Sequence, residues 1–205
     1  MGFSWSLYFC QRMLEGALTK EGFSEESFIM DRRPPPDIRH GRIGLAPYVD
    51  GVGVVGTDEQ AVDDGHQRVR AALFKWNLDP GDEDDASDEQ IFIGLAFDRG
   101  TCRISVRHER LWRIRLAATE MLARNRVSGQ QMRRFLGHFT WPALLRREAP
   151  SLVSTCYKFV EWAQETTCGI WAPVRRELDW IISLLPLLFA DARRPWHPHL
   201  YAADA

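Results

Sequence analysis

The stretch APYVDGVGVVGTDEQ (residues 46–60) restricts the folding of this 205-residue chain more than any other segment. Its valines favour extended backbone, because a branched Cβ fits the pleated surface of a sheet. Asp50-Gly51 is a strong turn signal between two such runs. The segment therefore predicts two short strands, IGLAPYVD and VGVV, joined as a β-hairpin with Asp50 at its tip.

A dinucleotide-binding loop is the alternative, since Gly51, Gly53 and Gly56 spell G-x-G-x-x-G. Such a loop requires a helix that begins within the glycine motif and a second parallel strand after that helix. Here the valines continue a strand through the motif, and the next helix is followed by NLDPGDEDDASDEQ. So acidic a segment cannot be a buried parallel strand, and the pattern favours the hairpin.

Apolar periodicity predicts helices on both sides of this hairpin. Residues 4–18 carry apolar side chains at helical spacing, and Thr57 with Gln60 is a predicted capping box for a helix that runs to about residue 76. Downstream, IFIGLAFD and TCRISV predict a second hairpin, and further helices are expected at about 108–124, 128–147, 150–165 and 173–189. The predicted fold class is α+β and mostly helical.

Single residues refine the downstream helices. Ser128 is expected as an N-cap and Pro173 in a first turn, whereas Pro186 should kink or shorten the last helix. Three tryptophans on apolar helix faces are predicted to belong to the core: Trp112, Trp141 and Trp162.

Charge is distributed unevenly along the chain. Residues 79–89 hold seven acids and no base, whereas residues 103–147 hold eleven arginines against Glu109 and Glu120. In the helix expected at 108–124, three arginines fall within an arc of about 60° beside an apolar stripe: Arg110, Arg113 and Arg124. Together with Arg133 and Arg134 they could track a phosphate backbone, and the alternative is a solvated basic face.

Cysteine usage and the chain start indicate an intracellular protein, in the cytoplasm or the nucleus. The four cysteines lie far apart and form no C-x-x-C pair, so we predict reduced, buried thiols. The first residues show no basic n-region and no cleavage site of a signal peptide. The longest apolar run, residues 180–190, is shorter than the roughly 20 residues of a membrane span, so no membrane partner is expected.

Five segments resemble, in order, parts of reverse transcriptases. MGFSWSLYFCQRMLEGAL is similar to a palm segment with the pattern P-x-G, three variable residues, Ala or Ser, Pro, and a Phe-Gln pair two residues later. In this segment Gly2, Ser6 and Gln11 match, whereas Leu7 and Cys10 replace the Pro and the Phe. YVDG (residues 48–51) resembles the Y-x-D-D hairpin, with Gly51 in place of the second Asp.

The other three segments resemble later parts of the same enzymes. FIGLAFD (residues 92–98) is similar to the primer-grip hairpin, and RVSGQQMRRFLGHFTWPALLRR (residues 126–147) to the thumb. PWHPHLYAADA resembles the entry to an RNase H domain, usually YTDAS, with Asp204 at the position of its first metal-binding carboxylate. The resemblance to retroelement reverse transcriptases, in which the polymerase leads directly into RNase H, extends over nearly the whole chain.

The resemblance implies a domain layout and a function. Residues 1–106 would be the C-terminal part of a palm with a primer-grip-like hairpin, 107–194 a helical thumb and connection, and 195–205 the first strand of a truncated RNase H-like domain. The expected function is that of a fragment of an RNA-directed DNA polymerase, whose parent enzyme transfers nucleotides with two Mg²⁺ ions. Asp50 would be a vestigial catalytic residue and metal ligand, and Asp204 part of an incomplete RNase H site. Gln11 and the five arginines would contact the RNA or DNA template-primer.

Several ligands of that chemistry are missing from these residues. The palm strand with its essential Asp does not occur, the second hairpin Asp is replaced, and three further RNase H acids are absent. Whether the chain is an enzyme is therefore left open, and so is whether it holds Mg²⁺ as the parent does. A non-catalytic nucleic-acid-binding module and a plain helical interaction protein are the alternatives, and for Asp50 the alternative is an ordinary turn residue.

Overall fold

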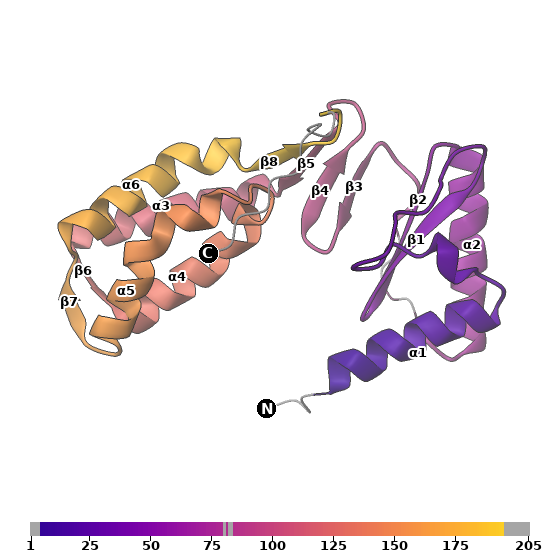
Figure 1. Cartoon of the computed structure of the whole chain (residues 1–205), viewed down its shortest axis with the longest axis horizontal. Coiled ribbons are helices and arrows are strands. Elements are labelled where there is room, and N and C mark those ends of the chain that lie inside the picture. Colours follow the sequence, from indigo (N-terminus) through magenta and orange to yellow (C-terminus); the bar gives the residue numbers. More distant parts are fainter. Residues whose placement is uncertain (1–4, 80, 82–83, 195–205) are drawn as a thin grey trace. The chain divides into compact units, whose positions relative to one another are not determined.

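A computed structural model describes residues 5–79, 81 and 84–194 of the chain. These form two compact units that divide between Ser87 and Asp88. The described residues contain six α-helices and small antiparallel sheets, which confirms the α+β class (Figure 1). The segment compared with RNase H, including Asp204, lies outside the described residues.

The first unit is a β-hairpin packed against two helices. Its elements are α1 (Ser6–Lys20), a 3₁₀ turn η1 (Glu25–Ser27), β1 (Ile43–Tyr48), β2 (Gly51–Gly56) and α2 (Glu59–Lys75). Strands β1 and β2 pair antiparallel from Ile43↔Gly56 to Tyr48↔Gly51. Buried residues of α1, α2, β1 and the segment between α1 and β1 form one core, namely Leu14, Leu18, Phe23, Phe28, Leu45, Val69, Ala72 and Leu73. The three glycines of the motif lie in or at the ends of β2, and α2 begins after it, so the segment is a hairpin strand and not a phosphate-binding loop.

The start of α2 differs from the predicted capping box. The N-cap is Asp58, whose carboxylate accepts a hydrogen bond from the Gln60 N–H at 3.1 Å. Thr57 instead donates its hydroxyl to the Ile38 carbonyl at 3.2 Å. The prediction of a Thr57 cap is wrong by one residue, because the threonine hydroxyl is hydrogen-bonded to Ile38, in the segment between η1 and β1.

The second unit joins a small sheet to a helical bundle. The sheet has the strand order β3 (Glu89–Phe92), β4 (Leu95–Asp98), β5 (Arg103–Val106) and β8 (Phe189–Asp191), all antiparallel. The pairing of β5 with β8 ties the β3–β4–β5 segment to residues 189–191. Residues 88–106 accordingly belong to the second unit together with the bundle, and the predicted palm and thumb layout stays a prediction.

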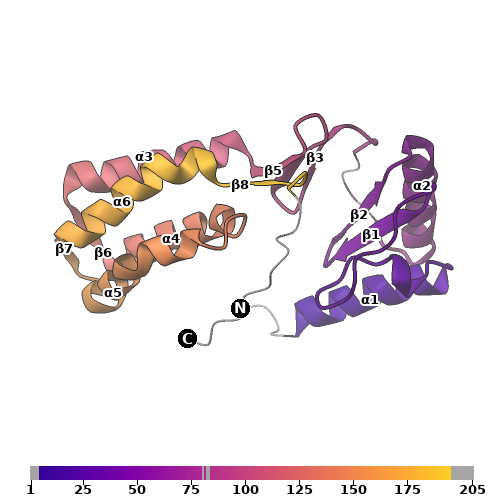
Figure 2. The ribbon, with the colours of Figure 1, turned by 45° about the horizontal axis from the view of Figure 1, so that its top comes forward.

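The bundle contains four helices: α3 (His108–Arg124), α4 (Gly129–Ala143), α5 (Ser154–Ala163) and α6 (Ala172–Leu184). Figure 2 shows α3 beside α6 and α4 beside α5, and these pairs are in contact. Two short strands in the connections between helices pair antiparallel: β6 (Arg126–Ser128), between α3 and α4, and β7 (Thr167–Gly169), between α5 and α6. The 3₁₀ turns η2 (Ala149–Val153) and η3 (Leu185–Leu187) precede α5 and follow α6.

The predicted helix signals in this unit are confirmed. Ser128 caps α4 in a complete capping box with Gln131. Pro173 lies in the first turn of α6, and α6 gives way to η3 at Leu185, next to Pro186. The apolar side chains at helical spacing in α6 and η3 are buried, namely Val174, Leu178, Ile181, Leu185 and Leu188.

A buried carboxylate connects two helices of the bundle. Glu177 of α6 accepts hydrogen bonds from the backbone N–H groups of Thr155 and Cys156, at 2.9 and 2.8 Å. These are first-turn donors of α5, which have no partner inside their own helix. Burial raises the pKa of Glu177, but the hydrogen bonds outweigh it and leave the pKa below its ordinary value. Glu177 therefore caps α5 in the charged form.

Two predictions about burial are wrong in part. Trp112 and Trp162 are exposed rather than in the core. All four cysteines are free, as predicted, but only Cys156 is buried, and Cys10 is exposed. Among the described residues, no helix is long and apolar enough to cross a membrane.

Candidate nucleic-acid interface and the Asp50 hairpin

The tip of the β1–β2 hairpin is the loop Val49-Asp50, because Tyr48 pairs with Gly51 across it. The sequence predicted Asp50-Gly51 as the turn, so the turn lies one residue earlier. Val49 adopts a left-handed backbone with φ 50°. A branched residue rarely takes this conformation, so surrounding contacts must hold it there.

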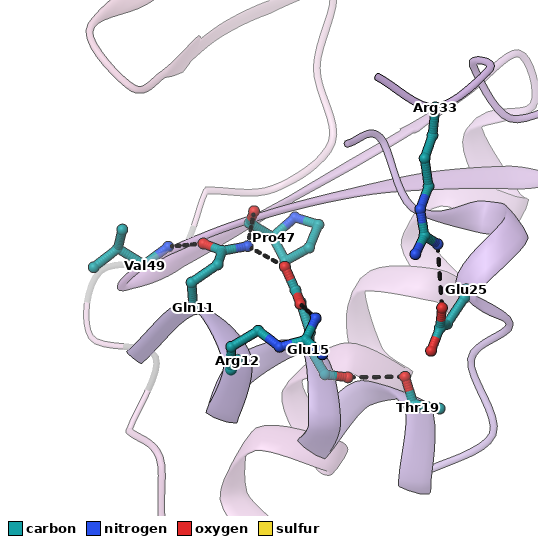
Figure 3. A network of polar contacts seen from close by, with 8 residues as sticks. All are labelled: Gln11, Arg12, Glu15, Thr19, Glu25, Arg33, Pro47 and Val49. Carbon is teal, nitrogen blue, oxygen red and sulfur yellow. Dashed lines mark hydrogen bonds and ion pairs between the residues drawn. The ribbon is translucent and has the colours of Figure 1, made fainter. Parts of the chain in front are cut away.

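Gln11 of α1 supplies these contacts (Figure 3). Its Oε1 accepts a hydrogen bond from the Val49 N–H at 2.8 Å, and its Nε2 donates to the Pro47 carbonyl at 3.0 Å. The same Nε2 donates to Glu15 Oε1 at 2.8 Å, and Arg12 pairs with the other oxygen of Glu15 at 2.9 Å. The amide of Gln11, predicted to contact nucleic acid, is thus engaged with the hairpin backbone.

Asp50 itself is exposed. It is the only acid between residues 43 and 57. Within the described parts of the chain, no group of three or more His, Cys, Asp or Glu side chains is placed to hold a metal ion. One exposed carboxylate on the hairpin does not fit a centre of two Mg²⁺ ions, which needs several carboxylate ligands. The magnesium site implied by the resemblance stays a prediction for the parent enzyme.

The second candidate site is the outer face of α4. The inner face of this helix is buried through residues at helical spacing, among them Met132, Phe135, Leu136 and Phe139. The outer face carries Arg133, Arg134 and Gly137, all exposed, with Trp141 one turn beyond the glycine. A Cβ built on Gly137 would have no neighbour within 4 Å. Gly137 therefore leaves an open notch on the helix face that also carries Arg133, Arg134 and Trp141.

Arg110 of α3 joins this face through Trp141. Its guanidinium lies 6.0 Å from the centroid of the Trp141 ring, within cation–π range. The β3–β4 turn lies at the edge of the same ring, since a Cβ on Gly94 would come within 3.5 Å of Trp141 Nε1. That Nε1 is the one buried side-chain nitrogen or oxygen without a hydrogen-bond partner among the described residues.

The structure separates the five predicted arginines. Arg110, Arg133 and Arg134 belong to the face formed by α4 and Trp141. Arg124 instead pairs with Glu120 on α3, with Nε to Oε1 at 2.6 Å, and Arg113 is exposed on the same side of α3.

Sequence reasoning assigned Trp141 to the core and passed over Gly137. The spacing in the sequence could have indicated this face, because Arg134 and Trp141 are seven residues apart and Gly137 lies between them on the same helical face. We name the set Arg110, Arg133, Arg134, Gly137 and Trp141 the α4 face.

No known protein family matches the chain, and a search of curated proteins finds no similar sequence.

Proposed function

We propose that this chain comes from the RNA-directed DNA polymerase of a retroelement, and that its second unit binds the backbone of a template-primer duplex without sequence preference. The observation that carries the proposal is the α4 face, which groups three arginines with an open glycine and an aromatic ring.

The chemistry of the α4 face suits a phosphodiester backbone. Arginine presents a planar fork of donors that matches phosphate oxygens. Gly137 has no side chain to hold a nucleic-acid strand away from the helix surface. Trp141, which is half-buried, adds an aromatic ring to this face. The surrounding residues 103–147 carry eleven arginines against two glutamates, which favours association with a polyanion.

The polymerase origin is supported by the order of the resembling segments and by one contact. Gln11 and the YVDG hairpin were singled out independently in the sequence, and they are hydrogen-bonded to each other across 38 positions. With a single carboxylate on the hairpin, we propose that the purified chain binds template-primer but does not extend it.

Fluorescence anisotropy with an RNA–DNA hybrid duplex, measured at several salt concentrations, tests the proposal. Each phosphate contact on a duplex contributes about −0.9 to the slope of log affinity against log salt. The triple variant Arg110→Ala, Arg133→Ala, Arg134→Ala should therefore flatten the slope by roughly 2 to 3 and weaken binding at low salt.

A matched control removes the same charge elsewhere. The variant Arg32→Ala, Arg176→Ala, Arg194→Ala takes three exposed arginines from outside the α4 face. It should change the slope much less than the first triple variant. Equal effects of both triple variants on the slope would mean that net charge alone drives binding. Weak, non-saturable binding of the duplex by the wild-type chain would instead favour a plain helical interaction protein.

A further inference from the structure

Helix α3 has a second apolar stripe, on the side opposite its buried face. The buried face runs through Ile114 and Ala118, with Leu111 and Met121 partly buried beside them. The second stripe consists of Trp112, Leu116, Thr119 and Ala123, all exposed. Trp112 is 58% exposed and Leu116 63%, although Arg115 stacks on the indole of Trp112 at 5.4 Å.

The spacing of this stripe is that of a helix–helix seam. Its members are separated by four, three and four residues, as at the a and d positions of a heptad. At 100° per residue they lie within an arc of about 60°, roughly opposite to the buried face. On a helix face that only contacts solvent, apolar residues are scattered singly and are not arranged in such a stripe.

We propose that α3 pairs with α3 of a second copy of this chain, antiparallel and across a two-fold axis between residues 117 and 118. The stripe is self-complementary in this arrangement. Trp112 faces Ala123 of the second copy, and Leu116 faces Thr119 of the second copy, so each large side chain meets a small one. A parallel pairing would instead set Trp112 against Trp112 and Ala123 against Ala123.

Charges beside the stripe agree with the same arrangement. One flank of the stripe carries Glu109, Arg113, Glu120 and Arg124. In an antiparallel pair related by a two-fold axis, this flank faces the same flank of the other copy. With a rise of 1.5 Å per residue, Glu109 is then about 3 Å along the axis from Arg124 of the second copy, and Arg113 is about 3 Å from Glu120 of the second copy.

The seam is short, so the association is weak and concentration-dependent. Four stripe positions span about 17 Å of helix, which buries less surface than a permanent dimer interface needs. The flanking ion pairs lie in solvent and contribute mainly to orientation rather than to affinity. Arg113 and Arg124 belong to the α3 stripe flank and not to the α4 face. The dimer proposal therefore does not depend on nucleic-acid binding by the α4 face.

Sedimentation equilibrium of the full chain over a range of concentrations, without nucleic acid, tests the pairing. The wild-type chain should show monomer and dimer, and Leu116→Glu should weaken dimerisation at least tenfold, because the substitution acts twice across the two-fold axis. Leu187→Glu is the matched control, since Leu187 is 55% exposed but lies in η3, and it should dimerise as the wild type does. Circular dichroism establishes that both variants are folded.

A charge exchange tests the orientation. Arg113→Glu should weaken the dimer by adding like charges to the flank, and the double variant Arg113→Glu, Glu120→Arg should restore it. A parallel pair would place Arg115 beside Glu120 of the second copy, so the double variant would then lose further affinity. The proposal would be overturned if the wild-type chain stayed monomeric at every concentration. It would also be overturned if Leu187→Glu dimerised as weakly as Leu116→Glu, or if the double variant did not regain the dimer affinity of the wild type.

Discussion

Gln11 holds the backbone of Val49 from a helix that lies 38 positions earlier in the chain, with Oε1 2.8 Å from the Val49 nitrogen. The same amide donates to the Pro47 carbonyl, so the end of β1 and the first residue of the hairpin tip are both tied to α1. This contact lets a branched residue occupy φ 50° next to Asp50. The position of the Asp50 carboxylate therefore depends on α1 as much as on the hairpin itself.

Gln11→Ala should loosen the hairpin tip. The variant leaves the Val49 N–H and the Pro47 carbonyl without their side-chain partner, at a cost of about 1–2 kcal/mol in local stability. Hydrogen exchange of the Val49 amide should become roughly tenfold faster, or more. Gln60→Ala is the control, because Gln60 is exposed and its side chain donates to Asp64 within α2, away from the hairpin tip. Unchanged Val49 exchange in Gln11→Ala would show that the turn holds its shape without Gln11.

Substitutions at Gly137 should separate stability from nucleic-acid binding. Gly137→Ala should stabilise the second unit by about 0.5–1 kcal/mol, since the Cβ has open space and alanine favours helix. Gly137→Leu should be no less stable than wild type but should bind the RNA–DNA duplex several-fold more weakly, because the side chain fills the notch. Urea denaturation and anisotropy measure the two effects.

Gly129→Ala provides the contrast within the same helix. A Cβ at Gly129 would lie 2.5 Å from the Val160 carbonyl oxygen and 2.6 Å from the Gln164 nitrogen, both backbone atoms. This variant should therefore lose stability by about 1–3 kcal/mol. If Gly137→Leu bound the duplex as tightly as wild type does, Gly137 would not belong to the interface.

Glu177 should make the second unit sensitive to acid. Its pKa in the folded chain is below the ordinary value of 4.5, because the hydrogen bonds from Thr155 and Cys156 outweigh the opposing effect of burial. A depressed carboxyl pKa contributes stability that is fully present above the unfolded value and is lost as the pH falls through the folded value. Glu177→Gln should cost about 1–3 kcal/mol at pH 7, and the difference from wild type should shrink below pH 4.5. Urea denaturation at pH 7 and in acid checks this, with exposed Glu161→Gln as the control; a difference that persists unchanged in acid would contradict it.

The purified 205-residue chain should not extend a primer on an RNA template with Mg²⁺ or Mn²⁺. The hairpin offers Asp50 alone, and two-ion catalysis needs further carboxylates to activate the primer hydroxyl and to neutralise the developing phosphate charge. Loss of several kcal/mol of such stabilisation lowers a rate by orders of magnitude, at about 1.4 kcal/mol per tenfold. Gly51→Asp should not restore activity, since it adds charge at the tip without a second strand. Incorporation by wild type that disappears in Asp50→Ala would show that another carboxylate completes the site.

The four thiols should react at very different rates. Burial and the neighbouring Glu177 raise the pKa of Cys156 far above that of a free thiol, and Cys10 is exposed on α1. Because the thiolate is the reactive form, iodoacetamide should label Cys10 first and leave Cys156 unlabelled in the folded chain. Mass spectrometry of the digested protein gives the order, and early labelling of Cys156 would mean that α5 opens readily.

The sequence by itself determined the elements whose signals are local. Helix α3 spans the predicted residues 108–124, and its apolar stripe, which contains Ile114, Ala118 and Met121, faces the core. Ser128 caps α4 and α6 ends beside Pro186 for the same reason, since a cap or a proline acts on the turn in which it lies. The hairpin strands follow from the valines of the second strand and from the turn signal between the two extended runs.

Tertiary structure decided everything that depends on a partner distant in the chain. The hairpin turned at Val49-Asp50 because Gln11 binds Val49, and Asp58 caps α2 because Ile38 engages Thr57. Periodicity also shows that a helix has an apolar face, but not which neighbour covers it. Trp112 and Trp141 lie on such faces, yet one is exposed and the other borders the β3–β4 turn. Helical spacing is set by bonds three or four residues apart, whereas burial is set by packing between segments that only the folded chain brings together.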